Sequence, residues 1–216
     1  LFAVPWHDKV VVGTTDIQRP VAESEPKPLD EEIDFILSTA GLYMSPAPTR
    51  KDIVSVFAGQ RPLAAPKKEG KSSKEVSRSH KIIVSDHDLI TITGGKWTSY
   101  RRMAEDTVDK AIELGKVEKR KCATRKLKVH GWRSNPNLAD HMYVYGSDEP
   151  AILQMIDENP ALGERLSEKY GYTVAEVLWA VREEMAQTVE DVLARRVRLL
   201  FVDAREAQKA ARRVAE

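Results

Sequence analysis

The sequence has little cysteine, almost no excess of charge and no long hydrophobic run. Cys122 is the single cysteine in 216 residues, so neither an intrachain disulfide nor a cysteine-built zinc site can form. A lone thiol is typical of a reducing compartment. The 34 Lys and Arg against 33 Asp and Glu leave a net charge of +1. That balance gives no overall attraction to nucleic acid, and we expect no nucleic-acid partner.

Other absences narrow the class further. No apolar run approaches the roughly 20 residues that span a bilayer, and the first residues do not form a secretory signal. The five histidines have no metal-ligand spacing, so we expect no metal site. From these features we expect a cytoplasmic protein, soluble or peripheral on the inner face of the cytoplasmic membrane. The chain begins at Leu1, without a methionine and directly in strand-like sequence, so we expect a fragment of a longer protein.

Residues 89–114 carry the strongest local signal. Apolar residues at 89, 90 and 92 predict a buried strand, and the helical spacing over 103–112 predicts a helix. Between them, Gly94 and Gly95 permit close backbone approach at a helix start, where unpaired N–H groups and a positive dipole end are expected. Lys96 adds a cation and Thr98 is the expected N-cap. The corner suits an electron-rich ligand, although a plain strand-to-helix connection has the same pattern.

The stretch before this corner predicts a mixture of strands and one helix. The helix should begin at Asp30 and end at Gly41, between proline breaks and a glycine stop. Pro62 forces Arg61 towards extended backbone, where its guanidinium could bind phosphate or simply face solvent. The expected strands, the first two forming a hairpin, are residues 1–4, 9–12, 52–57 and 82–84.

The composition changes after Gly115. Basic residues crowd residues 116–128 and predict a solvated linker, with phosphate or an anionic membrane as the alternative contact. Beyond it the pattern is helical. Thr173 and Glu176 form a capping-box signal before an apolar face that runs to Met185, and Asp203-x-x-Glu206 repeats the start signal. We therefore place domains at 1–117 and 131–216, with a basic linker at 118–130.

Six stretches, in this order and spacing, are similar to FAD-dependent glycerol-3-phosphate dehydrogenases. They are VPWHDKVVVGTTD (4–16), LDEEIDFIL (29–37), VFAGQRPL (56–63), SRSHKI (77–82), ITGGKWTSYRRMAEDT (92–107) and AEVLWAVREEMAQTVEDVLARRVRLLF (175–201). The resemblance implies an α+β fold. Residues 1–117 would be the last part of a flavin and substrate domain, with a mixed β-sheet and helices, and 131–216 a mostly α-helical domain that follows it.

The resemblance also implies a reaction. The intact protein would oxidise sn-glycerol 3-phosphate to dihydroxyacetone phosphate by hydride transfer to FAD, with electrons passing to a quinone and a possible peripheral membrane contact. This chain contains no G-x-G-x-x-G fingerprint after a strand, so the piece alone should bind FAD poorly and be inactive. The alternatives are an oxidase that uses oxygen and a non-catalytic module that binds a protein or a membrane.

By the same resemblance, the site residues fall into three groups. Arg61 and Arg78 would bind the substrate phosphate, and Lys96 would contact substrate oxygens. Lys96 and His80 are the candidate catalytic residues, His80 as acceptor of the hydroxyl proton. The flavin-binding residues would be Gly94, Gly95, Lys96, Trp97 and Thr98.

Overall fold

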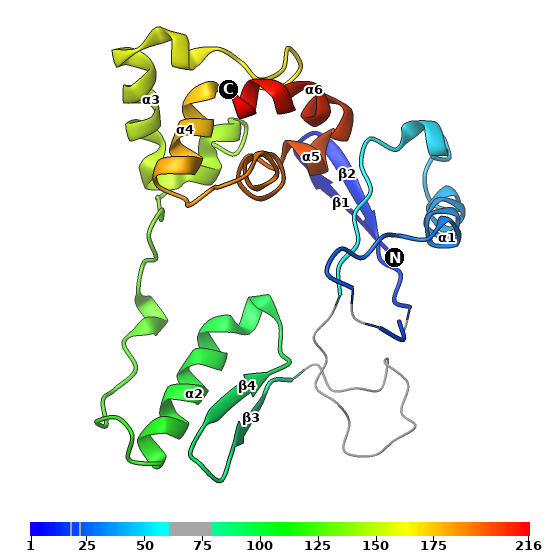
Figure 1. Cartoon of the computed structure of the whole chain (residues 1–216). Coiled ribbons are helices and arrows are strands. Elements are labelled where there is room, and N and C mark those ends of the chain that lie inside the picture. Colours follow the sequence, from blue (N-terminus) through cyan, green and yellow to red (C-terminus); the bar gives the residue numbers. More distant parts are fainter. Residues whose placement is uncertain (18, 22, 61–78) are drawn as a thin grey trace. The chain divides into compact units, whose positions relative to one another are not determined.

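The structure is a computed structural model that describes residues 1–17, 19–21, 23–60 and 79–216. Its contacts group the chain into two compact units, shown in Figure 1. Unit 1 comprises Leu1–Ile17, Glu25–Ala58 and Val129–Glu216, and unit 2 comprises Gln18–Ser24 and Gly59–Lys128. Helices together with two small antiparallel sheets confirm the α+β class. The domain boundaries at 117 and 130 stay a prediction, because the units are defined by contacts and not by chain order.

Unit 1 opens with the expected hairpin. β1 (Phe2–Trp6) pairs antiparallel with β2 (Lys9–Gly13), with Trp6 opposite Lys9. The two-residue loop between them has φ of 46° at His7 and 59° at Asp8. Positive φ at both loop residues is the geometry that matches the twist of paired strands, so the turn fixes the register.

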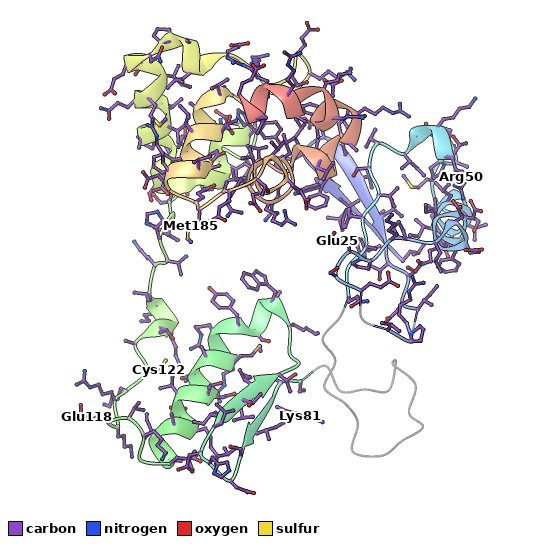
Figure 2. All side chains as sticks on the ribbon, viewed as in Figure 1. Glu25, Arg50, Lys81, Glu118, Cys122 and Met185 are labelled. Carbon is purple, nitrogen blue, oxygen red and sulfur yellow. The ribbon has the colours of Figure 1, made fainter. Side chains whose placement is uncertain are left out.

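The first helix forms where the sequence predicts it. α1 (Asp30–Gly41) is capped by Leu29, whose backbone N–H donates to Glu32 Oε2 at 2.9 Å. Asp30 therefore lies inside the first turn and does not cap it. Arg50, labelled in Figure 2 and part of the short helix η1 (Arg50–Asp52), pairs with Asp30 at 2.9 Å and with Asp34 at 2.7 Å.

The expected strand at 52–57 is wrong. Residues 53–60 form no strand and pair with none in the described ranges. The Val54 carbonyl instead accepts the N–H of Ala204 at 3.0 Å, and Ser55 Oγ donates to the Leu200 carbonyl at 2.8 Å. Tertiary contacts with the last helices therefore replace a sheet ladder.

The rest of unit 1 is helical. Its core forms two clusters, one that contains the fully buried Leu199 and one that contains the fully buried Ile152. The elements are η5 (His141–Asp148), α3 (Glu149–Glu158), η6 (Pro160–Gly163), α4 (Val174–Arg182), the π-helical η7 (Asp191–Arg196), α5 (Leu199–Val202) and α6 (Ala204–Ala215).

Both predicted capping signals of the helical region are confirmed. Glu176 accepts the Thr173 N–H at 2.7 Å, and the Asp203 side chain accepts the N–H of Glu206 at 3.1 Å. The predicted apolar face is too long, however. α4 ends at Arg182, and Met185 has φ of 59° and a 79% exposed side chain.

Unit 2 holds the glycine corner. β3 (Lys81–Val84) pairs antiparallel with β4 (Ile90–Thr93), followed by η3 (Trp97–Ser99) and α2 (Tyr100–Glu113), and later by η4 (Thr124–Lys126). The strand and the helix are confirmed, but the strand is not buried. Leu89 is 67% exposed, since β4 lies in a two-stranded sheet packed against α2.

No helix within the described parts of the chain is long and apolar enough to cross a membrane.

Candidate functional site

The glycine corner links β4 to η3 in a conformation that requires glycine. Gly94 has φ of 75° and Gly95 has φ of 81°. A residue with a side chain is strained at such positive φ. A Cβ on Gly95 would lie 2.6 Å from Sδ of Met103 and 3.2 Å from Cβ of His80. Met103 of α2 therefore packs against one side of the corner, and a larger residue at position 95 would have to displace the end of the Met103 side chain.

The opposite side of the corner is open. Lys96, Trp97 and Thr98 are exposed, Trp97 to 86%, and the rings of Trp97 and Tyr100 stack with centroids 5.5 Å apart. The N–H groups of Gly94 and Gly95 donate to no described residue. Free backbone donors beside exposed aromatic faces suit a flat, electron-rich ring, because such a ring both stacks and accepts hydrogen bonds.

The helix start after the corner is organised by Ser99. Ser99 Oγ donates to the Lys96 carbonyl at 2.9 Å and accepts the Lys96 N–H at 3.3 Å, while Thr98 lies inside η3. The expectation that Thr98 caps the helix is therefore wrong. Its place among the flavin-binding residues stays a prediction.

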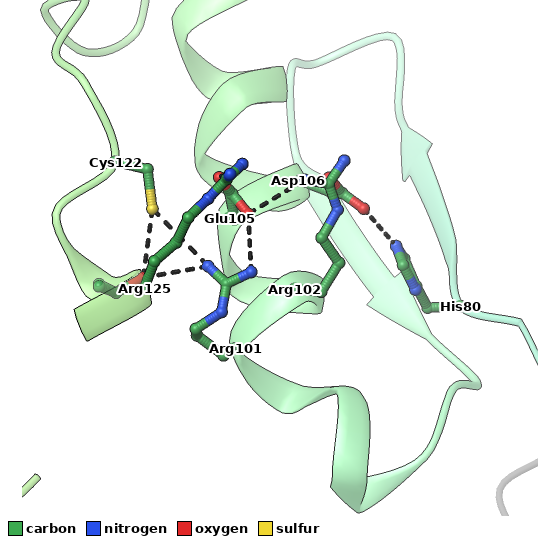
Figure 3. Close-up of polar contacts among 8 residues, drawn as sticks. His80, Arg101, Arg102, Glu105, Asp106, Cys122 and Arg125 are labelled. Atoms are coloured by element: carbon green, nitrogen blue, oxygen red, sulfur yellow. Dashed lines mark hydrogen bonds and ion pairs between the residues drawn. The ribbon is translucent and has the colours of Figure 1, made fainter. Parts of the chain in front are cut away.

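His80 is held by a carboxylate. Its Nε2 lies 2.9 Å from Oδ2 of Asp106, and Asp106 also pairs with Arg102 at 2.8 Å (Figure 3). When Nε2 donates to Asp106, Nδ1 is left as the acceptor nitrogen, which is the arrangement of an oriented general base. The same pair also stabilises α2, so a catalytic role for His80 stays a prediction.

The two predicted phosphate-binding arginines, Arg61 and Arg78, lie outside the described residues. Their convergence with Lys96 stays a prediction.

Sequence reasoning missed a charged cluster on α2. Glu105 is 8% exposed and accepts hydrogen bonds from Arg101 at 2.9 Å, Arg102 at 3.0 Å and Arg125 at 3.2 Å (Figure 3). Arg101 is the main cause that lowers the pKa of Glu105 to about 2. The i, i+3 and i, i+4 spacing of the helical arginines and Glu105 was the signal that could have found this cluster. The cluster ties α2 to the segment around η4.

The Glu105 cluster should lose its effect in acid. A carboxyl whose pKa is lowered on folding stabilises the native state above its unfolded pKa, near 4.5, and loses that contribution as pH falls towards about 2. We therefore expect Glu105→Gln to lower the urea midpoint of unit 2 at pH 7, and the difference from wild type to shrink steadily between pH 4.5 and 2. Circular dichroism during urea titration measures it. Glu113→Gln, an exposed change on the same helix, is the control. A difference for Glu105→Gln that is constant with pH would contradict the assignment.

The sequence matches a known family model. Residues 88–216 match the model described as the C-terminal domain of alpha-glycerophosphate oxidase. The matched region begins just before β4 and therefore includes the glycine corner, α2 and the helical part of unit 1.

The relatives that align with nearly all of this chain share one name. The chain is 34% identical to mitochondrial glycerol-3-phosphate dehydrogenase SDP6 of Arabidopsis thaliana, with all of this chain and 39% of the relative aligned. It is 34% identical to the mitochondrial glycerol-3-phosphate dehydrogenase of Saccharomyces cerevisiae, over 97% of this chain and 39% of the relative. A probable mitochondrial glycerol-3-phosphate dehydrogenase of Caenorhabditis elegans is 37% identical over 94% and 31%. The chain thus spans less than two fifths of these relatives.

The expected location is wrong. The relatives are named as mitochondrial proteins, which contradicts a cytoplasmic protein on the inner face of the cytoplasmic membrane. The prediction failed because a lone cysteine and a nearly neutral charge are compatible with a reducing environment but do not specify a compartment.

Proposed function

The chain belongs to the family of glycerol-3-phosphate dehydrogenases and alpha-glycerophosphate oxidases, as its sequence resemblance indicated, and from that membership we propose that it is part of a mitochondrial flavoprotein that oxidises sn-glycerol 3-phosphate to dihydroxyacetone phosphate. The observation that carries the proposal is the match over residues 88–216, a region that contains the glycine corner.

The proposed cofactor is FAD, which when bound accepts the hydride from the substrate carbon. The residues at the corner fit such a group. Gly94 and Gly95 offer N–H groups that donate to no described residue, and Trp97 offers an exposed aromatic face. Thr98 adds a hydroxyl on the same turn. We propose that the remaining cofactor contacts come from the part of the relatives that this chain does not match, since no G-x-G-x-x-G fingerprint is present here.

Lys96 is proposed to act by its charge. Its side chain is exposed at the corner and makes no ion pair with a described residue. An ammonium beside a site that gains negative charge stabilises that charge more strongly once water is excluded. The same ammonium can hold a substrate oxygen, so we assign Lys96 to both catalysis and substrate binding.

The remaining roles follow the family pattern. We propose that His80, oriented by Asp106, accepts the hydroxyl proton at Nδ1, since its Nε2 is already bonded. Arg61 and Arg78 are proposed to bind the substrate phosphate, for which a planar guanidinium is well suited. Electrons are proposed to pass to a quinone through peripheral contact with a membrane.

A lysine substitution tests the proposed chemistry. In the full-length, FAD-loaded protein, Lys96→Met should slow flavin reduction by glycerol 3-phosphate about 100-fold, the usual effect of removing one charge-stabilising group. Stopped-flow absorbance under anaerobic conditions measures the rate. Lys119→Met, an exposed lysine of the basic segment, should leave the rate unchanged. A Lys96→Met rate within threefold of the wild-type rate would contradict the catalytic role of Lys96.

One observation supports oxygen as an alternative electron acceptor. The matching family model is named for an oxidase, whereas the relatives are named dehydrogenases. Reoxidation of the reduced full-length protein by oxygen and by a soluble quinone separates the two. The dehydrogenase proposal expects the quinone to be much the faster acceptor.

A further inference from the structure

A pocket of about 380 Å³ lies wholly within unit 1. It is lined by His7 of the hairpin turn, by residues of η5 and by Arg198 just before α5. Its volume falls in the range of small-molecule sites. The π-helical turn η7 contributes further lining residues, and such turns are frequent at functional sites.

The buried carboxylate at this pocket is fully satisfied. Glu176 is 0% exposed and accepts hydrogen bonds from Tyr145 Oη at 3.1 Å and from the Thr173 N–H at 2.7 Å. His141 Nε2 lies 3.1 Å from the same carboxylate, which helps to raise the pKa of His141 against the effect of burial. Glu176 therefore has no free oxygen with which to attract a cation into the pocket.

Two of the pocket's arginines already have hydrogen-bond or ion-pair partners. Arg196 donates to the Glu184 carbonyl at 2.5 and 2.9 Å and lies 3.7 Å from its carboxylate. Burial raises the pKa of Glu184, and Arg196 acts in the opposite direction. Arg195 pairs with Glu190 at 2.7 Å and Asp191 at 3.3 Å.

The side chains of Arg198 and His7 are available to bind a ligand. Within the described ranges, neither the Arg198 guanidinium nor the His7 ring makes a hydrogen bond or an ion pair. Burial, Arg198 and His141 lower the pKa of His7, with Asp8 opposing, so the ring is neutral near pH 7 and offers one N–H donor. The backbone at Arg198 is fixed, because its carbonyl accepts the N–H of Phe201 at 3.0 Å.

A third donor faces the same space. Burial and then Glu176 raise the pKa of Tyr172 to about 12, so its phenol stays protonated and can donate. Among the described residues, the pocket thus combines an Arg198 guanidinium that makes no ion pair with the neutral donors His7 and Tyr172, whereas both carboxylates, Glu176 and Glu184, have partners. That balance favours an anion with several acceptor oxygens.

We propose that this pocket is a binding site for a phosphate oxyanion, held by the Arg198 guanidinium with hydrogen bonds from His7 and Tyr172. The ligand is inorganic phosphate or a small phosphomonoester. The site is separate from the glycine corner in its residues, so it goes beyond the proposed redox function and does not depend on it.

Titration of the 216-residue chain, without flavin, tests the site. Phosphate and methyl phosphate are added at constant ionic strength while NMR follows the histidine Cε1–H signals. We expect a saturable shift of the His7 signal with at least one of the two probes. Arg198→Gln should weaken that binding by about 10-fold or more, the usual worth of a hydrogen bond to a charged group. Arg212→Gln, 91% exposed and paired with Glu216, should not weaken it.

A second variant keeps the test decisive if Arg198→Gln fails to fold. His7→Asn preserves the turn, because asparagine tolerates positive φ, and removes the ring donor. Isothermal titration calorimetry, which needs no histidine signal, should show weaker phosphate binding by this variant. Failure of both probes to saturate the wild-type chain, or wild-type affinity in the folded variants, would overturn the proposal. Neither result bears on flavin reduction by the full-length protein.

Discussion

Glu176→Ala should lower the free energy of unfolding of unit 1 by about 3–5 kcal/mol, the cost of breaking a buried polar cluster. The carboxylate is completely buried and accepts three hydrogen bonds, from the Tyr145 hydroxyl, the Thr173 N–H and the Thr173 hydroxyl. Alanine leaves these donors without an acceptor inside the helical core. It also removes half of the capping box that starts α4.

Urea-induced unfolding followed by circular dichroism measures this loss. Glu183→Ala is the matched control, since Glu183 is an exposed glutamate just beyond α4, and it should change the unfolding free energy by less than about 0.5 kcal/mol. Glu176→Gln should fall between the two, because an amide oxygen still accepts hydrogen bonds. A Glu176→Ala loss below about 1 kcal/mol would show that water replaces the carboxylate, contrary to the buried cluster.

Local signals in the sequence predicted the starts of α4 and α6 and the glycine corner. The Thr173 and Glu176 spacing specifies a helix start because the two side chains satisfy each other's backbone groups three residues apart. The bonds from Glu176 to His141 and Tyr145 could not be predicted, because they join positions more than 30 residues apart. Local rules therefore located the cap but not the cluster built on it.

The same limit explains the strand error and the missed pocket. Residues 52–57 have a strand-like pattern, yet a strand exists only where a partner offers a ladder, and here the last helices take its hydrogen bonds. His7 and Arg198 line one pocket although 191 positions separate them. At the glycine corner, by contrast, the two glycines and Lys96 are adjacent in sequence, so the candidate site was visible before the fold.

Gly146→Ala should be as damaging as loss of Glu176, with an expected cost of about 3–5 kcal/mol from backbone strain, steric overlap and a lost backbone hydrogen bond. Gly146 is buried, and its φ of 55° with ψ of −116° is a conformation that only glycine adopts readily. A Cβ there would overlap the carbonyl oxygen of Gly131 and lie 2.8 Å from its carbon. Backbone atoms cannot rotate aside, so the two segments must separate and break the bond from the Ser147 N–H to the Gly131 carbonyl.

Gly131→Ala is the control that isolates strain from overlap. Gly131 also has positive φ, 80°, but a Cβ there would meet nothing nearer than the Tyr145 carbonyl oxygen at 3.8 Å. It should cost only about 1–2 kcal/mol, the penalty for a side chain in left-handed backbone. Urea midpoints of the two variants, measured on the same chain, give the comparison. Equal losses for the two would mean that the segments around Gly131 and Gly146 are not in contact, because positive φ alone would then account for both.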